Sequence, residues 1–168
     1  MNASFSIPQF SIPQIYKWLA EISDPEIPVL TILDLGIVRN VIIEDNALIV
    51  FITPTYSGCP AMDIISMQIR MALISRGVQN LSIKEQLSPT WTSDWITESG
   101  KLKMKEYGIS PPIRKSKNPS GLFEEEEVGC PHCNSHHTEL ISQFGATSCK
   151  SLYRCLDCKE PFEHFKCH

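Results

Sequence analysis

The first part of the chain has apolar residues at helical spacing. One face is apolar at every third or fourth position: Ile12, Ile15, Leu19 and Ile22. Ser11 and Gln14 form a capping-box pattern, and Pro13 suits a first helical turn. We therefore predict a helix that begins at Ser11 and ends before the Asp-Pro-Glu segment at residues 24–26.

Two runs rich in β-branched residues follow. They cover residues 36–43 and 48–53, and the short polar segment 44–46 separates them. Such a pattern predicts a β-hairpin. Apolar and polar residues alternate in part over residues 80–87, where we expect a third strand.

A second helix is expected from Pro60 to about Arg76, with Gly77 as its C-cap. It is apolar on most sides, and its polar strip is narrow: Asp63, Ser66 and Arg70. The helix therefore lies in the centre of the fold or meets a partner, and a homodimer would be one such arrangement. A mostly polar closing helix is expected over residues 91–107, ending at Gly108.

In chain order these elements predict an α-β-β-α-β-α open sandwich of the α+β class, which we assign to residues 1–109. Residues 110–127 are rich in Pro, Lys and Ser and then in Glu, a composition typical of a solvated linker. The remaining residues, 128–168, would form a small C-terminal domain.

The composition favours a globular protein. The 168 residues are 42% hydrophobic and 20% charged, with a net charge of −4, so nucleic acid is not an expected partner. The first residues lack a basic segment followed by an apolar run, and no stretch approaches the roughly 18 apolar residues of a membrane span. We expect a cytoplasmic protein, without a membrane partner, whose cysteines stay reduced.

Six of the seven cysteines lie beyond residue 129, and four form two C-x-x-C pairs: Cys130, Cys133, Cys155 and Cys158. Because 21 residues separate the pairs, the spacing is close to that of zinc ribbons, in which four thiolates hold one structural zinc ion. A domain this small has little core, so metal binding should supply much of its folding free energy. Iron is the rival metal, since four thiolates also hold iron–sulfur clusters.

Further candidate ligands lie in the same region. Cys149, six residues before Cys155, is the best candidate for an extra ligand. The others are expected to be exposed or packing residues, because a closed zinc site needs four ligands. They are His132, His136, His137, His164, Cys167 and His168.

Cys59 stands apart from this cluster, after Gly58 and directly before the helix expected at Pro60. Amides and the helix dipole at such a position would lower the thiol pKa and raise nucleophilicity and metal affinity. Alternatively, Cys59 is a small apolar residue packed under the loop. Polar residues that could neighbour it also have simple explanations as turn and cap residues: Asp24, Glu26, Asp34, Thr53 and Thr55.

Several segments resemble the PaaD family of bacterial phenylacetate degradation. In the first domain they are residues 24–28, 34–38, 53–60 and 91–96. In the C-terminal part they are residues 144–150 and 160–166. The first domain is also similar to SufT and to the eukaryotic cytosolic iron–sulfur assembly proteins, and the resemblance covers nearly the whole chain.

The resemblance implies an accessory component of the multicomponent phenylacetyl-CoA epoxidase, a diiron oxygenase fed by an iron–sulfur flavoprotein reductase. Catalysis by this chain is then not expected. By the same resemblance, Cys59 is the reactive, required residue, and the acidic loop with Asp24 and Glu26 lies close to it.

Three functions are consistent with these features. In the first, a maturation factor, Cys59 transiently holds iron or a nascent iron–sulfur cluster, or engages the client, while the ribbon docks to the oxygenase or reductase. In the second, a non-catalytic structural subunit, the apolar helix and ribbon bind the oxygenase. The third, a thiol oxidoreductase that pairs Cys59 with a ribbon cysteine, is disfavoured because thiolates committed to zinc are poor redox partners.

Overall fold

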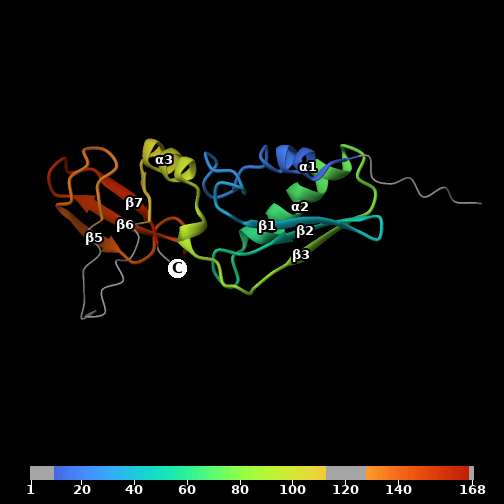
Figure 1. The fold of residues 1–168 in the computed structure, drawn as a ribbon. Helices are drawn as coiled ribbons and strands as arrows, with labels where there is room; N and C mark the ends of the chain where they lie inside the picture. Colours follow the sequence, from blue (N-terminus) through green and yellow to red (C-terminus); the bar gives the residue numbers. More distant parts are fainter. Residues whose placement is uncertain (1–9, 113–127, 167–168) are drawn as a thin grey trace, which may run out of the picture. The chain divides into compact units, whose positions relative to one another are not determined.

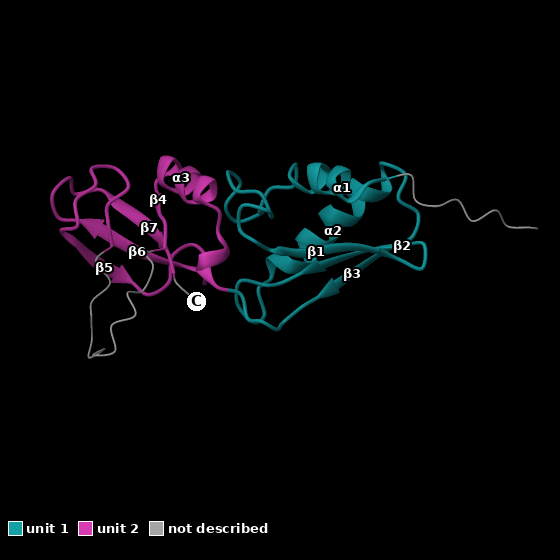
Figure 2. Ribbon diagram, in the orientation of Figure 1, with its two compact units in different colours: residues 1–91 teal, residues 92–168 magenta. Residues whose placement is uncertain are grey.

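The computed structural model describes residues 10–112 and 128–166, so most of the predicted linker lies outside the described residues. The chain divides into two compact units, Met1–Trp91 and Thr92–His168, which we describe separately (Figure 2). The helices of the described ranges contain 8, 14 and 10 residues, and none is long and apolar enough to cross a membrane.

The first unit has the predicted order α-β-β-α-β (Figure 1). Its elements are α1 (Ile12–Leu19), β1 (Val38–Glu44), β2 (Ala47–Ile52), α2 (Ala61–Ile74) and β3 (Leu81–Glu85). β1 and β2 form an antiparallel hairpin, closed by Asp45 and Asn46 with φ values of 47° and 63°. β3 lies parallel to β2, and α2 is the crossover between them.

The core of the first unit lies between the helices and the sheet. Its buried residues include Ile15, Leu19, Val50, Ile52, Ile65, Ile69 and Leu73. The opposite side of α2 is also apolar but faces solvent: Ile64, Met67, Met71 and Ile74 are 43%, 54%, 64% and 52% exposed. Thus α2 contributes one face to the core and leaves an apolar stripe, these four residues, on the surface.

Several predicted helix ends differ from the structure, and the helix predicted over residues 91–107 covers only Glu98–Tyr107. Ser11 is the N-cap of α1, but its side chain makes no capping hydrogen bond. Pro13 has no amide to donate, and the amide of Gln14 bonds the Ser11 carbonyl instead (2.9 Å), so the predicted capping box is wrong. α2 ends at Ile74, and the left-handed turn at Gly77 (φ +93°) comes three residues later.

In its described residues, the second unit contains a 3₁₀ turn, one helix and a four-stranded sheet with strand order β4-β7-β6-β5. Its elements are η1 (Ser93–Trp95), α3 (Glu98–Tyr107), β4 (Ile109–Ser110), β5 (Thr138–Ser142), β6 (Lys150–Cys155) and β7 (Pro161–Phe165). Thr97 is the N-cap of α3, and its hydroxyl oxygen accepts a hydrogen bond from the Gly100 amide (2.9 Å). Gly108, with φ +94°, is the C-cap.

The division between the units differs from the predicted boundary after residue 109. β4 pairs in parallel with β7, so that Ile109 lies opposite Glu163. A Cβ added to Gly108 would lie 3.4 Å from the His132 imidazole, which shows how closely the end of α3 meets the first cysteine turn. The segment from residue 92 to 110 therefore belongs with the ribbon, and the predicted closing helix is part of the second unit.

Candidate functional site

Cys59 lies in the loop that connects β2 to α2 and is partly buried. Its amide donates to the Tyr56 carbonyl (3.3 Å), and its own carbonyl accepts from the Met62 amide (3.3 Å). Gly58 has φ +79°, although a Cβ there would meet nothing within 4 Å. Glycine is therefore favoured by the left-handed backbone, which turns the chain directly before the thiol.

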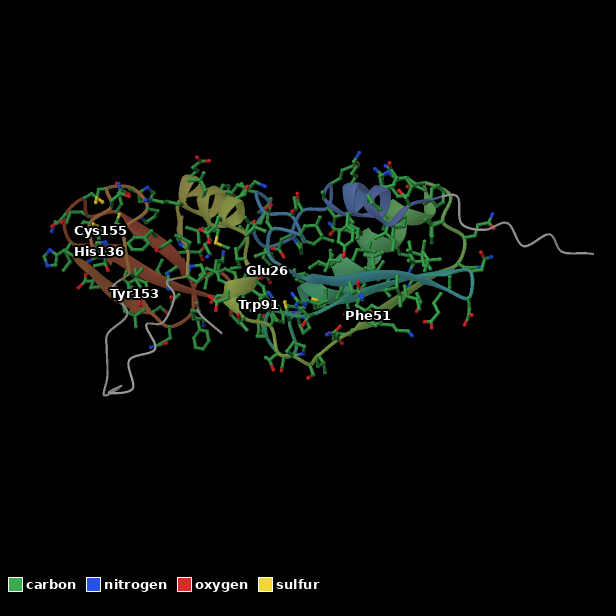
Figure 3. The ribbon with its side chains drawn as sticks, viewed as in Figure 1. Glu26, Phe51, Trp91, His136, Tyr153 and Cys155 are labelled. Atoms are coloured by element: carbon green, nitrogen blue, oxygen red, sulfur yellow. The ribbon has the colours of Figure 1, made fainter. Side chains whose placement is uncertain are left out.

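Asp24 and Glu26 lie on a second loop, between α1 and β1. Figure 3 labels Glu26 on this loop. Asp24 is buried, and its Oδ1 atom accepts hydrogen bonds from the amides of Glu26 (2.9 Å) and Ile27 (2.8 Å). The Asp24 amide donates to the Leu30 carbonyl (2.8 Å) and closes the loop. Asp24 thus fixes the loop that carries Glu26, and both carboxylates act electrostatically on the Cys59 thiol.

Thr53 and Asp34, two other candidates, have structural roles. Thr53 is buried, and its amide donates to the Ile37 carbonyl (2.9 Å), which extends the hairpin beyond β2. Asp34 accepts hydrogen bonds from the amide and the hydroxyl of Thr31 (both 3.0 Å). These contacts explain the two residues by their local structural roles.

The pKa of the Cys59 thiol is raised, so the prediction of a lowered pKa is wrong. Burial is the largest cause, and the negative charges of Glu26 and Asp24 add to it. The Ala61 amide and the Tyr56 side chain act in the opposite direction but do not outweigh them. At neutral pH Cys59 is therefore a neutral thiol, which would lose its proton when a cation binds beside it.

The four cysteines of the second unit form one compact group. Sγ of Cys130 lies 3.7 Å from that of Cys158, and Sγ of Cys133 lies 3.5 Å from that of Cys155. All four sulfur atoms are within 4.8 Å of one another. A tetrahedral ion with metal–sulfur distances of about 2.3 Å has sulfur–sulfur edges of about 3.8 Å, so the group fits a single zinc-like ion.

Two turns with the same backbone geometry present these cysteines. The Cys130 amide donates to the Ser135 carbonyl (2.8 Å), and the Cys155 amide donates to the Glu160 carbonyl (3.0 Å). In each turn the residue after the second cysteine has a left-handed backbone: Asn134 (φ +62°) and Lys159 (φ +67°). We call these two turns, residues 130–135 and 155–160, the first and second knuckles.

The thiol pKa values of this group differ because the four sulfur atoms lie so close together. Burial raises the pKa of Cys155, but amide hydrogen bonds from Cys158 and Asp157 and the neighbouring thiols bring it to about 6. The Glu160 amide lowers the pKa of Cys158, but burial and the other three thiols raise it to about 12. One thiol ionises readily and the next resists, because thiolates this close repel each other unless a metal ion lies among them.

Cys149 is buried at the start of the segment that becomes β6, whereas Cys155 ends that strand. Six residues of extended chain span about 20 Å, so Cys149 is too far away to be an extra ligand. Its Sγ atom lies 3.0 Å from the Thr147 hydroxyl. In the described residues, the group that could hold a metal ion consists of the four cysteines of the two C-x-x-C pairs.

Two family models match separate parts of the chain. Residues 13–81 match the family model "Iron-sulfur cluster assembly protein", and residues 114–166 match "PaaD zinc beta ribbon domain". A protein of Escherichia coli K12, named as a putative subunit of 1,2-phenylacetyl-CoA epoxidase, is 47% identical over 165 residues, which are 98% of this chain and 97% of that protein. The chain belongs to the PaaD family. The expected family and its α+β fold with a ribbon are therefore confirmed.

Two other relatives are similar to part of this PaaD-family chain. The "Fe-S protein maturation auxiliary factor" of Porphyromonas gingivalis is 36% identical over 92 residues, 54% of this chain and 87% of its own. A crystal structure of a domain of unknown function, DUF59, from Bacillus anthracis superposes with a TM-score of 0.51 at 23% identity. That match covers 55% of this chain and 89% of the solved one, and it shows a shared fold.

The raised pKa of Cys59 leads to a first prediction. Glu26→Gln removes the larger of the two acidic contributions, so Cys59 should react faster with iodoacetamide at neutral pH and its alkylation midpoint should move to lower pH. Mass spectrometry of the Cys59 peptide from metal-loaded protein measures this. Glu44→Gln, at the hairpin end of β1, is the matched control. An equal shift in both variants would contradict a local effect of Glu26.

The ligand set leads to a second prediction. Cys155→Ser should abolish stoichiometric zinc binding, and Cys149→Ser should leave it unchanged, because Cys149 lies outside the group of four. Metal analysis of the purified variants, with the thiolate-to-cobalt charge-transfer band of cobalt-substituted protein, measures both. Loss of metal in the Cys149 variant would contradict the four-ligand set.

Proposed function

We propose that this protein is an accessory maturation factor of phenylacetyl-CoA epoxidase in aerobic phenylacetate catabolism. Cys59 would transiently hold iron or a nascent iron–sulfur cluster on its way to the oxygenase or reductase. The observation that carries the proposal is a half-buried thiol beside two carboxylates, in the unit that matches the iron–sulfur assembly family.

The chemistry of the Cys59 site suits temporary binding. One thiol and neighbouring carboxylates attract a cation, but they do not supply the four thiolates with which the ribbon would enclose one. The raised pKa means that binding has to displace a proton, which weakens affinity at neutral pH. Ligand positions left open could be filled by groups of the client, which would allow transfer.

The ribbon suits a permanent metal. A closed set of four thiolates leaves no coordination position for substrate, and the domain has a small core that metal binding would complete. We therefore assign it one structural zinc ion and a role in docking rather than in chemistry. No catalytic step is assigned to this chain.

The apolar stripe of α2 supports contact with another subunit. Its four residues, Ile64, Met67, Met71 and Ile74, run along the solvent side of the helix that begins just after Cys59. Exposed methionines adapt to different partner surfaces. The Escherichia coli relative is named as part of a complex, and we propose that the oxygenase or reductase subunits cover this stripe.

The same stripe also favours the alternative function, a structural subunit that binds the oxygenase without handling metal. The two functions differ in what Cys59 does. In the alternative, Cys59 would be a packing residue of the loop, and its chemistry would be irrelevant to the metal content of the client.

A third prediction separates these functions. In cells that co-express the oxygenase and reductase, Cys59→Ala should lower the iron content of the purified complex severalfold, because the transient ligand is lost. Iron analysis and visible spectra of anaerobically purified protein measure this. Thr55→Ser in the same loop serves as a conservative control. Unchanged iron content in the Cys59 variant would favour the structural subunit.

A fourth prediction concerns docking. Met71→Asp should weaken association with the epoxidase subunits about tenfold or more, since it places a charge in an apolar interface. Pull-down and calorimetric titration measure association, and the melting temperature should not fall because Met71 is exposed. Leu102→Asp, at an apolar residue of α3 that is 58% exposed, is the matched control. Equal affinity of both variants and the wild type would exclude the stripe as the docking surface.

A further inference from the structure

A side-chain network connects the two knuckles of the ribbon. Asp157 lies in the second knuckle, between Cys155 and Cys158. Its Oδ2 atom accepts a hydrogen bond from the Ser135 hydroxyl (2.5 Å), and its Oδ1 atom lies 3.2 Å from Nδ1 of His137. The two oxygen atoms of the Asp157 carboxylate thus contact Ser135, the last residue of the first knuckle, and His137, two residues after it.

Backbone hydrogen bonds extend the network. The Ser135 hydroxyl also accepts from the His137 amide (3.0 Å), and the Ser135 carbonyl accepts from the amide of Cys130 (2.8 Å). The His137 carbonyl accepts from the Leu156 amide (2.8 Å), which returns the connection to the second knuckle. We call Ser135, His137 and Asp157 the knuckle clasp.

We propose that the knuckle clasp controls how fast the ribbon releases its metal ion. An ion held by two thiolates from each knuckle leaves when the knuckles move apart, and the clasp spans the gap that would then open. Asp157 acts here as a positioning residue, because the four sulfur atoms already form the complete ligand set.

The position of the ligands shows where opening would begin. Cys130 and Cys155 are buried, whereas Cys133 and Cys158 are exposed, so a chelator would reach the ion from the side of the exposed pair. The clasp is exposed as well, with side-chain exposures of 68% for His137 and 58% for Asp157. It can therefore break by local opening of the ribbon, without unfolding of the whole chain.

Exposed contacts of this kind add little to the stability of a whole domain. Their share in a local opening is larger, because a local opening breaks fewer interactions than unfolding of the whole domain does. Loss of both contacts of Asp157 should accelerate metal release by about threefold to tenfold, the factor that corresponds to one or two modest hydrogen bonds.

The experiment uses the full-length, zinc-loaded protein and excess pyridylazoresorcinol, whose absorbance follows zinc release. Asp157→Ala should release zinc about threefold to tenfold faster than the wild type. Glu160→Ala is the matched control, because it removes an equal charge from the same knuckle and keeps the carbonyl that bonds Cys155. Equal release rates in the two variants would overturn the proposal.

Variants of Ser135 test the contact itself. Ser135→Ala should also accelerate release. The double variant with Asp157→Ala should release zinc about as fast as Asp157→Ala alone, because both changes break the same contact between Ser135 and Asp157. Ser135→Thr keeps the hydroxyl and should restore slow release. Cobalt-substituted variants should keep the wild-type charge-transfer spectrum. Multiplicative rates, or a changed spectrum in Asp157→Ala, would show that Asp157 does not act through the clasp.

Discussion

Four thiol groups within 4.8 Å of one another cannot all ionise unless a cation lies among them. This constraint governs the second unit because two of the four cysteines, Cys130 and Cys155, also belong to its buried hydrophobic cluster. The buried cluster consists of Val128, Cys130, Cys155 and Phe162, with Tyr153 packed against it. Half of the cluster members belong to the candidate metal site, so binding an ion there would also complete the core.

Such a small cluster also explains why the ribbon extends beyond its cysteines. β4 adds a strand to β7, and α3 precedes it with Met104 fully buried. The sequence of this segment suggests a helix, and the helix exists, but its assignment to the first domain was wrong. A two-residue strand has no periodicity, so its pairing with a strand more than fifty residues later cannot be seen in the sequence.

Other features divide in the same way between local and tertiary causes. The hairpin at Asp45 and Asn46, the helix after Cys59 and the C-x-x-C knuckles depend on a few neighbouring residues, and they could be predicted. The knuckle clasp depends on Ser135 meeting Asp157, 22 positions later, which the pairing of β5 with β6 brings about. Neither residue alone carries a signal that would have indicated this contact.

Cys59 shows the limit of local reasoning most clearly. A thiol before a helix should be acidic when the helix is considered alone, yet burial and the loop at Asp24 and Glu26 reverse the direction. The reversal also changes the chemistry, because a neutral thiol among carboxylates is a poor nucleophile but can exchange its proton for a metal cation. The Cys59 site and the group of four cysteines therefore favour different residence times for a metal. The four ribbon thiols could enclose an ion completely, whereas an ion at Cys59 would have to compete with a proton and would depend on ligands from elsewhere.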